Sequence, residues 1–225
     1  MRTIAKGREP SCLVALKTTS GSDWSSVHGD QKSEIVARLY ADQHGLCAYC
    51  MRRLAAPTTA AVRVEHWAPR HEADADPFAW KDLLGVCDGG GDGAPPRDQH
   101  CDRRKGGRAL SVHPARDADL EHRIRFRGDG RLADGIPRDE LVDVLNLDHP
   151  RLIANRKAVI DAVLIVRRNH PDKLDAQLQR YREPGPDGLL PEYVTVALAR
   201  LEKAAKAEAG RRQRVARAKR SDRNR

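Results

Sequence analysis

The sequence is poor in aromatic residues and has no long apolar run. Phe, Trp and Tyr together make up 4% of the 225 residues, so large anchoring side chains are few. No stretch approaches the roughly 18 apolar residues of a membrane-spanning helix. The first eight residues, MRTIAKGR, lack an apolar signal core. We therefore expect a cytoplasmic protein without a membrane partner, with one core or a small domain plus attached helices.

A nucleotide-binding P-loop is also missing. No GxxxxGK[ST] pattern occurs, and the glycine-rich run GGGDG at 89–93 lacks the lysine that such a loop requires. Any dependence of this protein on a nucleotide would therefore come from a partner acting in trans.

Positive charge is plentiful but unevenly placed. The formal net charge is +9. Residues 211–225 hold seven arginines, one lysine and one aspartate, a net charge of +7, which leaves +2 for residues 1–210. Such a block is typical of a disordered tail that contacts nucleic acid or another acidic partner, and a purely solubilising tail explains it equally well.

Four of the five cysteines have a spacing that indicates a zinc site. Cytosolic thiols stay reduced, so spaced cysteines point to metal before disulfides. Cys47 and Cys50 form a CxxC knuckle whose thiolates can share one tetrahedral ion, and Cys87 and Cys101 would complete the ligand set. His100 is an alternative to Cys101 as the fourth ligand.

The CxxC pair has a second interpretation, and the fifth cysteine, Cys12, needs one of its own. A CxxC pair can be a thioredoxin-like redox centre, but no βαβ pattern surrounds this one. Cys12 stands apart in an apparent coil, and we interpret it as a small hydrophobe or an idle thiol.

The apolar spacing predicts a mixed helix and strand content. Residues 1–20 are expected to be turn-rich. We expect a helix over 31–44 that stops at Gly45, a strand over 62–67 and a second short apolar segment over 80–87. Further expectations are a short helix or turn from 100, a hairpin over 124–132, helical structure over 139–168 and a last helix over about 191–209.

Glu65, His66 and Asp102 have the residue types that phosphodiester hydrolysis needs. Histidine titrates near neutrality and can activate water as a general base. Carboxylates such as Glu65 and Asp102 can hold Mg²⁺ or Mn²⁺, which prefer hard oxygen ligands. Alternatively, Glu65-His66 is an ordinary strand-end pair and Asp102 only a helix N-cap. We assign no chemistry to four further histidines, which we read as turn or loop residues: His44, His71, His113 and His149.

Four segments together resemble the zinc-containing HNH endonuclease family: CAYC at 47–50, VEHWAPR at 64–70, WKDLLGVC at 80–87 and CDRRKGG at 101–107. The sequence is most similar to the PtuB-like HNH nucleases of Septu and retron-linked antiphage systems. That likeness includes MRTIAKGREP at 1–10, QHGLCAYC at 43–50, LNL at 145–147 and NR at 155–156. It covers roughly residues 1–165.

The resemblance implies an α+β fold with a zinc-stabilised ββα-metal (His-Me finger) core and flanking, mostly C-terminal, helices. It implies that His66 is the general base, and that Glu65 and Asp102 are metal-side residues. Asp82 would stand where the family has a bracing asparagine. The family pattern reads H-N-H, and this sequence has Asp at the last two letters. Arg103, Arg104 and Lys105 are candidates to contact substrate phosphates, and a role in capping the helix or facing solvent is equally open.

These expectations divide the chain into four parts. Residues 1–45 would form an N-terminal segment and helix that pack on the core, and residues 46–112 the nuclease core. Residues 113–210 would form a hairpin and helices that can dock a partner, and residues 211–225 the basic tail.

Three functions are consistent with the sequence. The first is a metal-dependent endonuclease, acting on DNA rather than RNA, that works in antiphage defence with a PtuA-like ATPase subunit, as the resemblance implies. The second is a non-catalytic, zinc-stabilised module that binds nucleic acid. The third is a stand-alone nuclease of the restriction or homing type.

Overall fold

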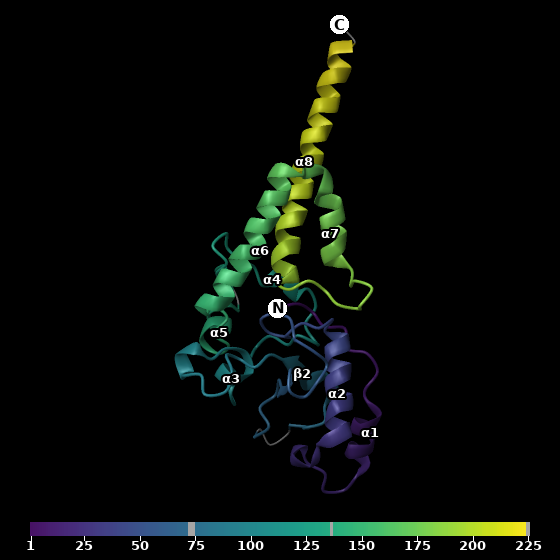
Figure 1. Ribbon diagram of the computed structural model, residues 1–225, viewed down its shortest axis with the longest axis vertical. Coiled ribbons are helices and arrows are strands. Elements are labelled where there is room, and N and C mark those ends of the chain that lie inside the picture. Colours follow the sequence, from purple (N-terminus) through teal and green to yellow (C-terminus); the bar gives the residue numbers. More distant parts are fainter. Residues whose placement is uncertain (72–74, 136, 224–225) are drawn as a thin grey trace.

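The structure is a computed structural model that describes residues 1–71, 75–135 and 137–223 (Figure 1). It has an α+β fold, mostly helical with one small sheet, as the sequence predicts. The strands are β1 (Arg63–His66) and β2 (Leu83–Val86). The α-helices are α1 (Ser11–Thr18), α2 (Gly29–Asp42), α3 (Cys101–Lys105), α4 (Leu120–Arg123), α5 (Arg138–Asp143), α6 (Pro150–Asn169), α7 (Leu174–Arg182) and α8 (Val194–Arg223). None of the helices in the described ranges is long and apolar enough to cross a membrane.

The two strands pair in antiparallel fashion at the centre of the lower half of the molecule (Figure 1). Glu65 lies opposite Leu84, and His66 lies opposite Leu83. The expected strand over 62–67 is confirmed. The apolar segment over 80–87 also forms a strand, preceded by a single 3₁₀ turn at Trp80–Asp82. The short α3 then follows β2 in the chain.

Helix α2 packs against the sheet and fixes its position. It buries Ile35, Val36 and Leu39, which the helical spacing predicts, and it ends near Gly45, whose φ of 72° few other residues adopt. The Gln43 side-chain amide forms two hydrogen bonds with the backbone of Gly85. Its nitrogen donates to the Gly85 carbonyl at 2.7 Å, and its oxygen accepts from the Gly85 N–H at 2.7 Å. A Cβ at Gly85 would lie 3.2 Å from that amide, so the contact favours glycine there.

Helices α6, α7 and α8 form the upper half of the molecule (Figure 1). Their buried side chains make a separate apolar cluster that includes Val163, Leu174 and Leu201. The expected helical stretch over 139–168 is two helices, α5 and α6. The chain turns between them at Asn146, which has a φ of 51°, and α6 begins at Pro150, where a missing N–H costs nothing.

The hairpin expected over 124–132 is present in minimal form, with one antiparallel bridge between Phe126 and Leu132 and a backbone hydrogen bond from Arg127 to Arg131. Other expectations are corrected by the structure. Residues 11–18 form α1 where the sequence predicts turns. The last helix does not stop near 209, and the tail expected to be disordered from 211 is helical to Arg223, because Ala, Arg and Lys all favour helix. Residues 224–225 of that tail lie outside the described residues.

Candidate active site and metal centre

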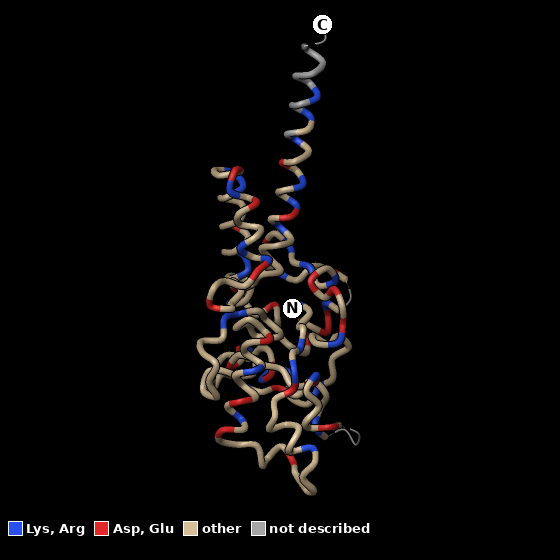
Figure 2. The backbone as a smooth tube through the Cα atoms, turned by 90° about the vertical axis from the view of Figure 1, so that its right-hand side faces the viewer, with Lys and Arg blue, Asp and Glu red and all other residues tan. Residues whose placement is uncertain are grey.

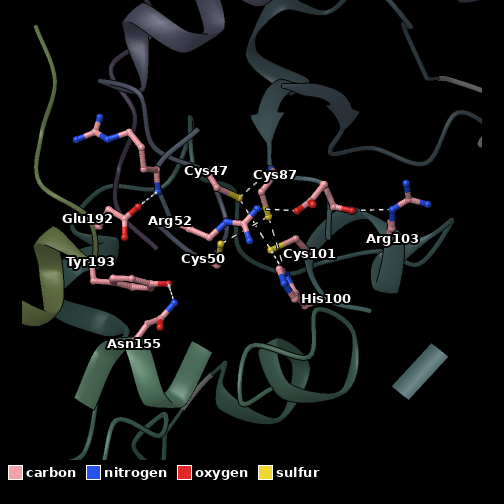
Figure 3. A network of polar contacts seen from close by, with 12 residues as sticks. Cys47, Cys50, Arg52, Cys87, His100, Cys101, Arg103, Asn155, Glu192 and Tyr193 are labelled. Atoms are coloured by element: carbon pink, nitrogen blue, oxygen red, sulfur yellow. Dashed lines mark hydrogen bonds and ion pairs between the residues drawn. The ribbon is translucent and has the colours of Figure 1, made fainter. Parts of the chain in front are cut away.

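The four cysteines predicted to bind zinc come together in the interior. The sulfur atoms of Cys47, Cys50, Cys87 and Cys101 all lie within 4.8 Å of one another, and all four residues are buried. Zinc–sulfur bonds of about 2.3 Å in a tetrahedron place the sulfurs about 3.8 Å apart. The distances here are 3.8 Å between Cys50 and Cys87 and 3.9 Å between Cys47 and Cys101. The cluster therefore has the composition and size of a four-cysteine zinc site, and Figure 3 shows the sulfurs turned toward a common centre.

Three local features position the four cysteines. Cys47 and Cys50 lie on a tight turn closed by the Leu46–Arg53 bridge. Cys87 follows β2, and its N–H points to the Cys47 sulfur at 3.4 Å. Cys101 opens α3, where its N–H donates to the Leu145 carbonyl at 2.9 Å. The LNL segment at 145–147 thus holds Cys101 in position through this backbone hydrogen bond.

His100 lies beside the cluster and outside the four-sulfur set. Its Nδ1 is 3.2 Å from the Cys101 sulfur and 3.9 Å from the Cys87 sulfur. Burial lowers the pKa of His100 to about 4. A neutral imidazole whose Nδ1–H donates to a thiolate sulfur stabilises a metal-bound cysteine without replacing it. The geometry thus favours Cys101 over His100 as the fourth ligand.

A second group of polar side chains lines an open cleft of about 550 Å³ beside this cluster. Glu65 and His66 reach it from the end of β1, and Asp102 reaches it from the first turn of α3. Asp102 also follows Cys101 directly in the chain, so the cysteine cluster fixes its position. The structure therefore brings together the three residues that the sequence singles out.

Glu65 is held by two buried donors. Its Oε1 accepts from the Tyr49 hydroxyl at 3.0 Å and forms an ion pair with Lys105 Nζ at 2.9 Å. Burial and the neighbouring carboxylate of Asp102 raise the pKa of Glu65 to about 8, against the opposing effect of Lys105. Two carboxylates close enough to share a proton form a pair that a cation would stabilise.

His66 is arranged as a neutral base. Its Nε2 lies 3.0 Å from the Pro77 carbonyl, which can only accept, so Nε2 carries the proton and Nδ1 keeps its lone pair. The ring meets Trp24 edge to face, with centroids 4.4 Å apart. Burial lowers the pKa of His66 to about 4, so the imidazole is neutral at neutral pH.

The three basic candidates on α3 have other partners. Lys105 is buried, and besides Glu65 it donates to the His66 carbonyl at 3.2 Å. It therefore holds the site from inside and does not reach a substrate, nor does it face solvent. Arg103 donates to the Asp88 carbonyl at 2.6 Å and pairs with Asp92, and Arg104 lies 3.5 Å from the Pro96 carbonyl. Both arginines brace the glycine-rich loop.

Asp82 lies outside the cleft. Its Oδ1 accepts from His113 Nε2 at 2.8 Å and from Arg116 Nη2 at 2.6 Å. Burial opposes ionisation, but these two partners lower the pKa of Asp82 below its ordinary value. The backbone carbonyl of Asp82 accepts from the Trp67 N–H at 2.8 Å, and this bond extends the pairing of the strands just past His66. Its connection to the cleft is therefore through the backbone.

Several residues of the site escape sequence reasoning. Tyr49 lies between the two knuckle cysteines, and nothing in its position indicates a bond to Glu65. Arg63 pairs with Asp102 at 2.8 Å, and its place two residues before Glu65, on the same face of a strand, is a signal that could have found it. Trp24, Arg70 and His71 also line the cleft. His71, expected to be a loop residue without chemistry, is close enough that a Cβ on Gly107 would lie 3.1 Å from its ring.

Comparisons with known proteins add no assignment. No protein-family model matches the chain, and no curated protein matches it.

Proposed function

We propose that this protein is a metal-dependent endonuclease of the HNH type that hydrolyses phosphodiester bonds, most readily those of DNA. One observation carries the proposal: His66, Glu65 and Asp102 line a single cleft beside the four-cysteine cluster. Asp102 is fixed there by α3, which also carries Cys101, and Glu65 by the hydroxyl of Tyr49, which lies between Cys47 and Cys50. The order of β1, β2 and α3 supports the proposal, because a ββα-metal finger would have two strands followed by a helix, with the base at the end of the first strand and a carboxylate on the helix.

The cleft carboxylates fit a divalent ion. Glu65 and Asp102 offer hard oxygen atoms, and each already has a cationic neighbour, Lys105 or Arg63. These cations favour the ionised form of each carboxylate, which is the form that a divalent ion would bind. Neutralisation of charge on the phosphate and on the leaving oxygen is the chemistry that a bound Mg²⁺ or Mn²⁺ supplies.

His66 supplies the proton acceptor. Its Nδ1 takes a proton from a water molecule while the water oxygen attacks phosphorus, and the bond from phosphorus to the leaving oxygen breaks. The Pro77 carbonyl keeps the imidazole in the tautomer that this step needs. Trp24 holds the ring in place and shields it from water on one side.

The cysteine cluster is proposed to hold a structural zinc. All four positions are protein sulfurs, so no coordination position is left for water or substrate. Cys101, as a ligand of such a zinc, would be held in one orientation and would fix the neighbouring Asp102.

The decisive test is plasmid nicking with Mg²⁺ or Mn²⁺ by the wild type, His66→Ala and a control, His170→Ala, which replaces an exposed histidine far from the cleft. Loss of a positioned general base lowers a rate by roughly 100-fold to 10,000-fold. We expect nicking by the wild type and the control and almost none by His66→Ala. Equal nicking by all three proteins would overturn the assignment of His66.

A second function, a binding module without catalysis, is favoured by one observation. Both carboxylates are satisfied by protein cations, as in an ordinary structural ion-pair network. In that case Mg²⁺ and Mn²⁺ would not bind to the cleft. Titration of Mn²⁺ followed by electron paramagnetic resonance, with Asp102→Asn as the comparison, separates the two functions.

The proposal includes an ATPase partner and a role in antiphage defence, which the resemblance to PtuB-like nucleases supports. The chain has no P-loop, so nucleotide dependence would require a second protein. Genomic co-occurrence with an ATPase gene, followed by co-purification of the two tagged proteins, tests it. Failure of the two purified proteins to associate would count against it.

A further inference from the structure

A groove of about 660 Å³ runs between the segment at 121–126 and the lower part of α8. Arg125, Arg200, Lys203 and Lys206 contribute cations to its walls. Its two acidic side chains are already engaged: Glu121 accepts from the Thr3 N–H at 3.1 Å, and Glu202 pairs with Arg182 at 3.0 Å. The groove therefore presents a net positive charge to whatever enters it.

The positive surface continues along α8 beyond the groove. The helix extends well past the ends of α6 and α7, and Figure 2 shows basic residues along its free part. At 3.6 residues per turn, Lys203, Lys206, Arg214 and Arg217 fall within an arc of roughly 80° on one side of the helix. All four are exposed, and none of them forms an ion pair with another described residue. We call these four residues the α8 stripe.

The dimensions and chemistry of the stripe suit a nucleic-acid backbone. Lys203 and Arg217 are fourteen positions apart, which is roughly 21 Å of helix, or about six base-pair steps of a duplex. A protein partner would be expected to meet apolar or aromatic anchors. The exposed large hydrophobic residues among the described positions are Val14, Leu164 and Ile165, and none of them lies on α8. The large apolar residues that line the groove, Phe126 and Leu198, are partly buried against the core.

We propose that the groove and the α8 stripe bind the phosphate backbone of a nucleic-acid duplex, at a surface separate from the cleft of Glu65, His66 and Asp102. The cleft is formed by β1 and α3 in the lower half of the molecule, whereas α8 leaves from the opposite end (Figure 1). A duplex held on α8 is thus anchored away from the point of cleavage. The contacts are electrostatic, so the surface recognises charge and shape and carries no sequence preference.

The test is binding of a labelled 30-base-pair DNA, measured by fluorescence anisotropy over a range of salt concentrations without divalent ions. The test variant carries Lys203→Gln, Lys206→Gln, Arg214→Gln and Arg217→Gln. The control removes the same charge from four other cations that form no ion pair with described residues: Arg8→Gln, Lys32→Gln, Lys81→Gln and Arg151→Gln. Far-ultraviolet circular dichroism and thermal melting establish that both variants fold.

The stripe variant is expected to bind roughly tenfold or more weakly than wild type. Its slope of log affinity against log salt should be smaller by about 3 to 4, because each phosphate contact contributes about 0.9. The control should keep most of the affinity and the slope. An unchanged affinity and slope in the stripe variant would overturn the proposal and leave the surface to an acidic protein.

His66→Ala separates this inference from the proposed endonuclease activity. The proposal predicts that His66→Ala binds the duplex like the wild type, since the stripe is intact. If the wild type binds through the stripe but never nicks DNA, either alone or with the proposed ATPase partner present, the nuclease assignment fails and the binding surface stands.

Discussion

The cysteine cluster and the cleft beside it are built from neighbouring residues, yet they differ in burial, in accessibility and in the kind of ligand they offer. The cluster is closed and buried, and it uses one kind of ligand. The cleft is open, and its two carboxylates carry unlike partners: Glu65 meets a buried lysine and tyrosine, whereas Asp102 meets a half-exposed arginine. A closed set of soft ligands stabilises a fold, and an open pair of hard ligands leaves room for a substrate. Asp102 connects the two, since it follows Cys101 in the chain.

The largest effect should come from breaking the cluster. Cys47→Ser removes one ligand of the proposed zinc, and because structural zinc supplies much of a small site's folding energy, we expect the core to unfold. Elemental analysis should give about one zinc per chain in wild type and far less in the variant. Cys12→Ser is the matched control, because Cys12 lies outside the cluster with its sulfur 3.6 Å from the Gln31 carbonyl. Wild-type protein that contains no zinc and still melts in one cooperative transition would contradict the prediction.

A smaller but still large effect is expected from Lys105→Met. The variant leaves Glu65 buried without its cation, and breaking a buried ion pair in this way costs roughly 3–5 kcal/mol. Because burial has raised the folded-state pKa of Glu65 to about 8, its contribution to stability is greatest below its ordinary value of 4.5 and is lost as the pH rises toward 8. Glu65 becomes ionised only as the pH approaches 8, and only the ionised form needs the charge of Lys105. The Lys105→Met variant should therefore lose more free energy of unfolding at pH 8 than at pH 5, as measured by urea denaturation.

Two further variants check the Lys105 result. Lys81→Met removes an exposed lysine and should change the free energy of unfolding little. Glu65→Gln combined with Lys105→Met removes both charges and should recover part of the loss. If Lys105→Met were as stable as wild type at pH 8, Lys105 would not be neutralising Glu65.

How much of these two regions can be predicted from sequence depends on how local their signals are. The CxxC knuckle, the strand carrying Glu65 and His66, and the helix that stops just before Gly45 each depend on a few adjacent residues, and all are confirmed. The Lys105–Glu65 pair and the bond from His113 to Asp82 join residues 40 and 31 positions apart, so no local pattern encodes them. The length of α8 was missed for another reason: a high density of like charge suggests disorder, whereas the same residues have high helix propensity.

Asp102→Asn should separate chemistry from stability. Its ion pair with Arg63 is half-exposed, so we expect the free energy of unfolding to change by no more than about 1 kcal/mol. Nicking should fall roughly 100-fold, and Mn²⁺ should bind more weakly, because a hard ligand is lost. Asp143→Asn, an exposed carboxylate without an ion pair among the described residues, is the control. If Asp102→Asn nicked DNA as fast as the wild type, Asp102 would have no catalytic role and would not connect the cysteine cluster to the chemistry of the cleft.

The smallest effect is expected from Asp82→Asn. The carboxylate touches His113 and Arg116 and does not line the cleft, whereas its backbone carbonyl, which the substitution keeps, bonds to Trp67. Nicking should therefore stay within about threefold of wild type, and stability should fall by about 1 kcal/mol at neutral pH. Because its partners lower the folded-state pKa of Asp82, its contribution to stability is present above its ordinary value of 3.8 and is lost as the pH falls through the lower folded-state value. Wild type and variant should thus converge in stability in strong acid, as followed by urea denaturation. A loss of nicking as large as that of Asp102→Asn would instead mean that the Asp82 carboxylate takes part in catalysis, although it does not line the cleft.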